Sequence, residues 1–159
     1  MNILRAPLIV LIALAASSPL AVERGSFSSI PYWDCFARAA EEYSLNPLLL
    51  AAIAEQESSF NSSAINTNNG RAVGLMQIHS WWFPKLSVYG ISEKDLYNAC
   101  TNVAVGAWIF SQKTARYGNT WKAVGSYFAG TGTTKETNEL RINYAASVSR
   151  RYQRLAGRL

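Results

Sequence analysis

The stretch NPLLLAAIAEQES, residues 46–58, decides the fold because it joins a helix start signal to an apolar helical face that ends on an acid. Asn46 is a favourable N-cap residue, and proline is well tolerated at the first helical position, where Pro47 stands. The apolar run behind them, Leu48–Ala54, is long enough for about two helical turns. The sequence therefore predicts a helix that begins at Pro47 and runs into Glu57.

The acid at the end of this helix is predicted to face the protein interior. Leu49, Ile53 and Glu57 are spaced four residues apart, so the carboxyl group of Glu57 continues the apolar stripe. Burial would raise its pKa, as a general acid near neutral pH requires. Glu55 lies about 200° around the helix and is expected to be solvated. From periodicity alone, a carboxyl group placed like Glu57 is more often a structural hydrogen-bonding group than a catalyst.

The rest of the chain is also helical in pattern. Helices are predicted over residues 32–43, about 102–117, 121–129 with Thr120 as cap, and about 138–156, with Ser92–Asp95 as a further helix start. Residues 61–74 are polar and predict a loop with room for a small hairpin, and a short apolar element, 75–78, follows. The fold class is therefore mainly α, with one domain over residues 22–159.

The first 21 residues have the architecture of a secretory signal peptide. Arg5 precedes an apolar run from Ala6 to Ala16, and small residues follow through Ala21. Cleavage after Ala15, Ser17 or Ala21 is compatible with this pattern, and an uncleaved anchor is the alternative. Export through such a signal predicts a periplasmic protein.

Two cysteines, Cys35 and Cys100, remain in the mature part of the chain. In an oxidising compartment an even pair indicates a disulfide, which for a loop of about 65 residues would stabilise the fold by roughly 4 kcal/mol. Two buried free thiols are the alternative. Neither cysteine has a metal-ligand spacing, so we expect no metal site.

The formal net charge is +5 at pH 7. A basic exported protein meets anionic cell-wall polymers and membranes, so nucleic acid is not the expected partner. The densest basic cluster comprises Arg150, Arg151, Arg154 and Arg158. A solvated helix face is at least as good an interpretation of it as a binding surface.

Three motifs occur in the order and spacing of one known family. They are Glu57-Ser58 with Phe60, then Gly74-Leu75-Met76-Gln77-Ile78, then Ser126-Tyr127-Phe128-Ala129-Gly130. Together they resemble the lytic transglycosylases with the soluble-transglycosylase, goose-lysozyme-like fold, over roughly residues 32–152. Further stretches resemble the small members that accompany type III secretion, conjugation and type IV pilus machines: Cys35-Phe36, Ala51–Ala54, Ala99-Cys100 and Gly106-Ala107.

The resemblance implies a lysozyme-like helical domain with a substrate cleft and a defined chemistry. Glu57 would protonate the glycosidic oxygen leaving C1 of N-acetylmuramic acid and then act as a base. The substrate's acetamido group would stabilise C1, and closure of O6 on C1 would give a 1,6-anhydro product. No cofactor and no second carboxylate are required. The implied partners are peptidoglycan strands and the components of a secretion or pilus machine, with the protein a monomer.

The remaining site residues are implied in the same way. Ser58 and residues 74–77 (Gly74, Leu75, Met76 and Gln77) would line the cleft and bind substrate. Tyr127 would place its hydroxyl near the acid, and Tyr144 matches a second cleft tyrosine more loosely. Met76 could equally be wall packing. The remote acids Asp34, Asp95, Glu136 and Glu139 are expected to be surface charges or caps.

The sequence departs from the family pattern at two positions. Phe128 stands where asparagine is usual, and Ala72, beside Arg71, stands where many secretion-associated relatives carry an acid. Two alternative functions remain: a hydrolytic lysozyme on the same scaffold, which would add water to C1, and a non-catalytic wall-binding subunit, which would tolerate Phe128. Trp81-Trp82-Phe83 could include a sugar-stacking ring or simply pack in the core. His79 is expected to be a surface or hydrogen-bonding residue.

Overall fold

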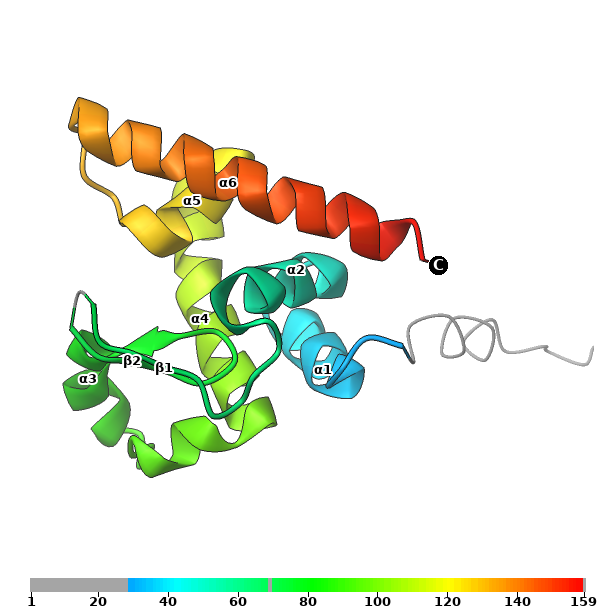
Figure 1. Ribbon diagram of the computed structural model, residues 1–159. Helices are drawn as coiled ribbons and strands as arrows, with labels where there is room; N and C mark the ends of the chain where they lie inside the picture. The colour runs from blue at the N-terminus through cyan, green and yellow to red at the C-terminus, as the bar shows by residue number, and fades with distance from the viewer. Residues whose placement is uncertain (1–28, 69, 159) are drawn as a thin grey trace, which may run out of the picture.

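A computed structural model describes residues 29–68 and 70–158 (Figure 1). The expected signal peptide, residues 1–21, lies outside this range. The elements are helices α1 (Trp33–Tyr43) and α2 (Pro47–Ser58), strands β1 (Ile65–Asn66), β2 (Ala72–Val73) and β3 (Ile78–His79), the 3₁₀ turn η2 (Ser80–Trp82), helix α3 (Phe83–Ser87), the turn η3 (Lys94–Tyr97), and helices α4 (Ala99–Tyr117), α5 (Trp121–Ala129) and α6 (Lys135–Ala156). The mainly α fold class is confirmed.

Helix α2 forms as its sequence predicts. The Asn46 side chain accepts hydrogen bonds from the backbone N–H groups of Leu48 and Leu49, at 2.9 and 3.2 Å, and Pro47 occupies the first turn. Residues Leu50 to Ala54 are fully buried. The helix packs against α1, the preceding helix, on one side and against α6, from the other end of the chain, on the other (Figure 1).

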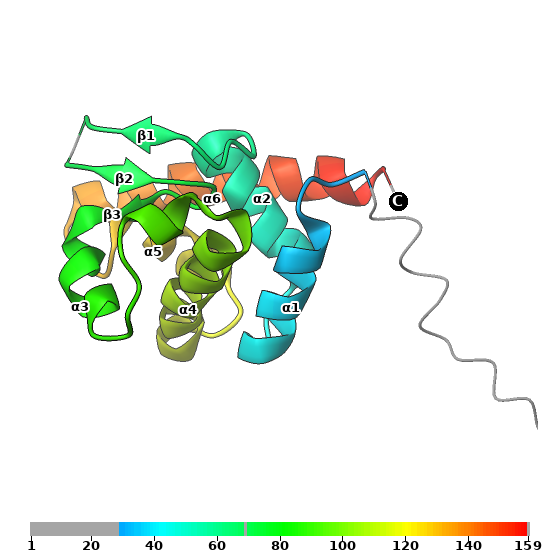
Figure 2. The ribbon, with the colours of Figure 1, turned by 90° about the horizontal axis from the view of Figure 1, so that it is seen from below.

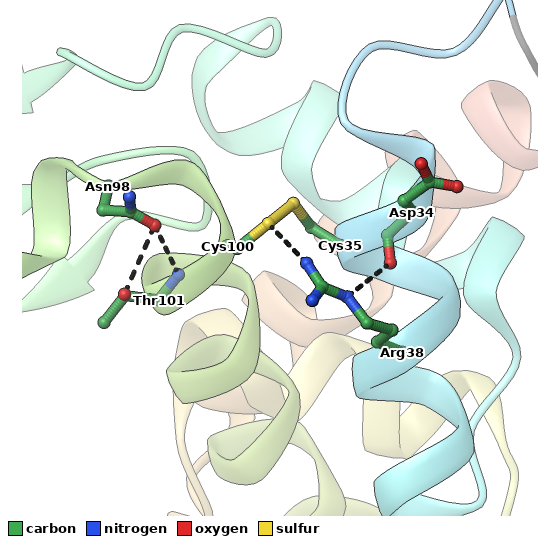
Figure 3. Close-up of a disulfide and its surroundings, with 6 residues drawn as sticks. All are labelled: Asp34, Cys35, Arg38, Asn98, Cys100 and Thr101. Carbon is green, nitrogen blue, oxygen red and sulfur yellow. Dashed lines mark hydrogen bonds between the residues drawn. A yellow bond between two sulfur atoms is a disulfide. The ribbon is translucent and has the colours of Figure 1, made fainter.

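The disulfide between Cys35 and Cys100 joins α1 to the first turn of α4 (Figure 3). Arg38 lies over it, donating from Nη2 to Sγ of Cys100 at 3.2 Å and from Nε to the Asp34 carbonyl at 3.3 Å. The expected cystine is confirmed. It fixes the two helices that pack beside α2.

Helix α4 begins three residues earlier than the apolar pattern indicated, because Asn98 caps it by accepting from the Thr101 N–H at 3.1 Å. The start signal at Ser92–Asp95 is real, since the Asp95 carboxylate accepts from the Ser92 N–H at 2.8 Å. It opens only the turn η3, however, and not a helix of its own.

The polar loop contains the expected hairpin and one strand more. Strands β1 and β2 pair antiparallel with Ile65 opposite Val73, and β2 pairs antiparallel with β3, Val73 opposite Ile78. Figure 2 shows this small sheet at one end of the molecule, beside α3 and away from α1. The third strand lies in the short apolar element after the loop, where we expected no strand.

Helices α5 and α6 pack closely against each other. A side chain at Gly125 would come within 2.4 Å of the Arg141 carbonyl, so glycine is required at this crossing. Thr120 caps α5 as expected, whereas α6 starts earlier than predicted because Thr134 caps it through the Thr137 N–H.

The basic C-terminal cluster is partly used inside the fold. Arg154 pairs with Glu55 at 2.6 Å, and the Glu55 side chain is only 16% exposed. The expectation of a solvated Glu55 was therefore wrong, because α6 lies across α2 and supplies a counter-charge that helix periodicity alone does not reveal. Within residues 29–68 and 70–158, no helix has the length and apolar character needed to cross a membrane.

Candidate active site

A cleft of about 390 Å³ lies between the small sheet with η2 on one side and α5 with α6 on the other. Its walls come from eight elements, α2, β1, β2, β3, η2, α4, α5 and α6, and from the turns that hold Gly70 and Gln77. The lining residues are Glu57, Asn66, Gly70, Ala72, Gln77, Ile78, His79, Trp81, Trp82, Ile109, Tyr127, Phe128, Ala129 and Leu140.

Glu57 supplies the only carboxyl group among the described residues that line this cleft. It stands in the last turn of α2, where the apolar stripe of that helix meets the cleft. Burial raises its pKa from the usual 4.5 to about 7, and a hydrogen bond from Tyr144 opposes part of that rise. The raised pKa expected from the helix pattern is confirmed, and near neutral pH the group can both give and take a proton.

Two tyrosines surround the acid, with roles that differ from those the resemblance implied. Tyr144 of α6 donates its hydroxyl hydrogen to Oε1 of Glu57. Tyr127 of α5 instead donates to the carbonyl of Met76 at 2.8 Å. Burial and the nearby Glu57 raise the pKa of both phenols well above the usual value, so both stay protonated as donors.

The segment from Gly74 to Gln77 forms the wall behind the cleft surface. Leu75 and Met76 are fully buried, and neither they nor Gly74 and Ser58 are among the lining residues. The Ser58 hydroxyl donates to the Leu75 carbonyl at 2.8 Å. These residues therefore hold α2 and the wall together, and Gln77 is the member of the segment that reaches the cleft.

Gly74 is required for packing. Its φ is +78°, and an added Cβ would lie 2.0 Å from Nδ2 of Asn102 and 2.5 Å from the Leu96 carbonyl. Gln77 also has a positive φ, +48°, and its side-chain amide donates to the carbonyls of Gly74 at 3.0 Å and Ala64 at 3.3 Å. The wall is thus a tightly bonded turn.

Asn102 organises this turn, and sequence reasoning missed it. The side chain is fully buried, accepts from the Met76 N–H at 2.7 Å, and donates to the carbonyls of Val73 at 3.0 Å and Leu96 at 2.8 Å. An asparagine on the apolar face of a predicted helix was the available signal, because a buried amide needs partners.

Arg141 was missed in the same way. Its guanidinium is buried and donates to the carbonyls of Gly130 at 2.8 Å and Gly132 at 2.5 Å, and to the Asn138 side chain. It fixes the turn that follows Ala129 and so holds the end of α5 at the cleft.

Exposed aromatic rings stand on both sides of the cleft. Trp81 is 62% exposed and stacks on Trp82, with ring centroids 4.4 Å apart. On the other wall Phe128 is 56% exposed and stacks on Tyr144. His79 accepts from the Trp81 N–H through Nδ1 at 3.2 Å, as expected of a hydrogen-bonding residue.

The remote acids lie outside the cleft. Asp34 is exposed on α1, Asp95 and Glu136 serve helix and turn starts, and Glu139 faces Lys135 at 3.9 Å. The described residues contain no group of three or more histidine, cysteine, aspartate or glutamate side chains that could hold a metal ion. Glu57, with its raised pKa, is the acid that the described lining residues present to the cleft.

Comparison with known families gives one match, described as "Transglycosylase SLT domain", over residues 34–148. Three similar proteins are Protein IpgF of Shigella flexneri, Invasion protein IagB of Salmonella typhimurium (strain SL1344), and X polypeptide of Escherichia coli. IpgF is 40% identical over 126 residues, covering 77% of this chain and 82% of IpgF. IagB is 39% identical over 127 residues, covering 78% of this chain and 78% of IagB. X polypeptide is 38% identical over 122 residues, covering 75% of this chain and 72% of X polypeptide.

Among solved structures, the lytic transglycosylase Slt of Pseudomonas aeruginosa is similar with a TM-score of 0.67 and 25% identity. The match covers 81% of this chain and 24% of the Slt chain, so this chain spans about a quarter of that protein. Slt was solved there as an inactive mutant with glutamine in place of one glutamate.

Proposed function

Because the chain belongs to the transglycosylase SLT domain family and is a peptidoglycan lytic transglycosylase, we propose that Glu57 is its single catalytic acid and base. In this proposal the enzyme cuts the β-1,4 bond between N-acetylmuramic acid and N-acetylglucosamine and leaves a 1,6-anhydro end. The observation that carries it is the lone carboxyl group in the cleft, held at a pKa of about 7.

The first step uses Glu57 as an acid. Tyr144 donates to Oε1, so the acidic proton belongs on Oε2 and is available to the glycosidic oxygen. Transfer of that proton breaks the bond between C1 and the leaving oxygen. The acetamido group of the substrate supports the charge that develops at C1, since the cleft offers no second carboxylate among its described lining residues.

The second step uses the same group as a base. The carboxylate of Glu57 takes the proton of the muramic O6 hydroxyl as O6 bonds to C1, which restores the neutral acid and closes the anhydro ring. A group with a pKa near the working pH serves both directions. Tyr144 favours the transient carboxylate, because its hydroxyl donates to the charged form.

Substrate contacts are assigned to side chains that reach the cleft. Gln77 lines the same cleft as Glu57, and the exposed ring of Trp81 suits the apolar face of a pyranose. Residues Ser58, Gly74, Leu75 and Met76, together with Tyr127, act in this proposal through the wall that they hold in place.

Digestion of purified peptidoglycan followed by mass spectrometry of the fragments tests the reaction. Muramic ends lighter by one water than reducing ends support the anhydro product. Ordinary reducing ends would instead indicate a hydrolytic lysozyme, and no release would contradict the proposed cleavage and leave the wall-binding subunit as the alternative. Glu57→Gln is expected to abolish release, with the exposed-surface variant Glu41→Gln as the matched control.

We also propose a cellular setting. IagB is named as an invasion protein, and this chain resembles it over most of its length. The proposal is that the enzyme is exported by residues 1–21 and opens the wall locally in the periplasm for a secretion, conjugation or pilus machine. Cell fractionation followed by N-terminal sequencing tests export. A periplasmic protein that lacks the first residues would support it, and a cytosolic protein that still begins at Met1 would contradict it.

A further inference from the structure

Phe128 lies between the cleft and the tyrosine that bonds to the acid. Both Phe128 and Glu57 line the cleft, whereas Tyr144 is 7% exposed and does not line it. The rings of Phe128 and Tyr144 are parallel within 2°, with centroids 5.2 Å apart. The outer face of the Tyr144 ring is therefore covered by a phenyl ring at the position where the family pattern has asparagine.

This stack bears on Glu57 through the phenol. The Tyr144 hydroxyl donates to the carboxyl group of Glu57, so any rotation or hydration of the tyrosine ring alters that hydrogen bond. Offset parallel stacking favours one ring orientation, and an apolar cover keeps water from a partly buried hydrogen bond. By contrast, Trp81 on the opposite wall stacks on Trp82, and among the described residues neither tryptophan is hydrogen-bonded to Glu57.

We propose that Phe128 is a positioning residue of this site, whose ring holds Tyr144 against Glu57 and shields their hydrogen bond from solvent. The inference rests on Glu57 being the acid of the proposed function. It assigns a use to Phe128, which stands in the third motif where the family pattern has asparagine.

The groups that face Glu57 limit what else could tune it. Tyr144 of α6 and Tyr127 of α5 are the titratable groups beside it, and His79 of β3 lies across the same cleft. Burial is the main cause that raises the pKa of Tyr144, and the positive charge of Arg151 of α6 opposes part of that rise. On α2 itself, Glu55 is taken up by its pair with Arg154. Burial is the larger influence on the pKa of Glu57 and the Tyr144 hydrogen bond opposes it, so uncovering the site should shift that pKa.

The test compares Phe128→Asn with Phe128→Tyr, which keeps an aromatic ring. Carbon-13 NMR titration of the labelled glutamate carboxyl groups, assigned with Glu57→Gln, gives the pKa of Glu57 without any need for activity. We expect Phe128→Asn to shift it by about half a pH unit or more, downward where hydration of the uncovered acid outweighs the weakened Tyr144 bond and upward where it does not. The high-pH limb of the cleavage profile should move by the same amount, with Phe128→Tyr close to wild type.

The matched control is Ile142→Asn, an equally polar change at a residue of α6 that is 67% exposed and outside the cleft lining. It should leave both readouts unchanged. Because Phe128 is itself more than half exposed, the variants should keep the wild-type Tm within a few degrees.

Two results would overturn the inference: a wild-type Glu57 pKa in Phe128→Asn, or a raised KM with an unshifted pH profile, which would make Phe128 a substrate platform. If the wild-type protein released no glycan fragments, the proposed function would fail instead. The NMR titration would still decide the role of Phe128.

Discussion

Tyr144 donates its hydroxyl hydrogen to Oε1 of Glu57 across 87 positions of the sequence. This bond joins the last long helix to the end of α2 at the floor of the cleft. It opposes the rise in pKa that burial imposes on Glu57, since it favours the charged carboxylate. The pKa of Glu57 is therefore set by burial, which raises it, and by the Tyr144 hydrogen bond, which lowers it, and each effect can be removed separately.

Removing the Tyr144 hydroxyl should raise the pKa of Glu57 further. Tyr144→Phe keeps the ring and its stack on Phe128 but deletes the donor, so the carboxylate loses stabilisation. We expect the high-pH limb of cleavage to move upward and kcat to fall about ten-fold or more, as the acid loses its orientation. A pH series of initial rates on soluble peptidoglycan fragments measures both.

Tyr127→Phe is the matched control for that experiment. It deletes a phenol from the same neighbourhood but leaves Glu57 its partner, and it orphans the Met76 carbonyl instead. We expect Tyr127→Phe to lower the unfolding free energy by about 1–3 kcal/mol and to leave the high-pH limb of the cleavage profile almost unchanged. Equal limb shifts in the two variants would contradict the separate roles assigned to the two tyrosines.

The raised pKa of Glu57 also makes a prediction about stability that does not depend on activity. The folded protein keeps this proton up to about pH 7, whereas the unfolded chain loses it near 4.5. The unfolded state therefore binds fewer protons between these values, and stability falls as pH rises through that window. Below about 4.5 the full stability is present.

Glu57→Gln removes this dependence. The variant should match the wild type near pH 4 and exceed it in unfolding free energy at pH 8 by up to about 3 kcal/mol. Urea unfolding at a series of pH values measures the difference. For Glu41→Gln, on the exposed face of α1, the difference from wild type should not grow with pH. A constant difference between wild type and Glu57→Gln from pH 4 to 8 would refute the raised pKa.

Local signals were sufficient for most of the helices. Asn46 with Pro47, and Thr120 with Gly118, are neighbours in sequence, so their capping geometry could be anticipated. Helix α6 started early because Thr134 lies outside the apolar period that was used to find it. The third strand escaped because β3 is two residues long and is defined by its pairing with β2.

The sequence predicted the acid of the site correctly but predicted the residues around it less well. The four-residue spacing placed Glu57 correctly because a helix fixes which residues share a face. That Tyr144, and not Tyr127, bonds directly to Glu57 depends on how α5 and α6 cross, which no local pattern encodes. Asn102 belongs to the same class, since its three backbone partners come from residues 73–76 and 96.

Asn102→Ala should weaken the wall behind Glu57. The change leaves the carbonyls of Val73 and Leu96 and the Met76 N–H buried without this partner. Each orphaned group costs about 1–3 kcal/mol, so we expect a loss of at least about 3 kcal/mol, measured by urea unfolding. Asn98→Ala, on the first turn of the same helix, should cost only about 1 kcal/mol as a lost cap. Similar losses in the two variants would contradict the organising role of Asn102.

Breaking the cystine should lower stability without altering the acid. The Cys35–Cys100 bond closes a loop of 65 residues between α1 and α4, neither of which supplies Glu57 or its tyrosines. Replacing both cysteines with alanine is expected to reduce the unfolding free energy by roughly 4 kcal/mol. Dithiothreitol should lower the Tm of the wild type and leave that of the double variant unchanged, which controls for effects of the reductant. At a temperature where the double variant is folded, its pH profile of cleavage should follow that of the wild type. A shifted profile would mean that the cystine also shapes the cleft.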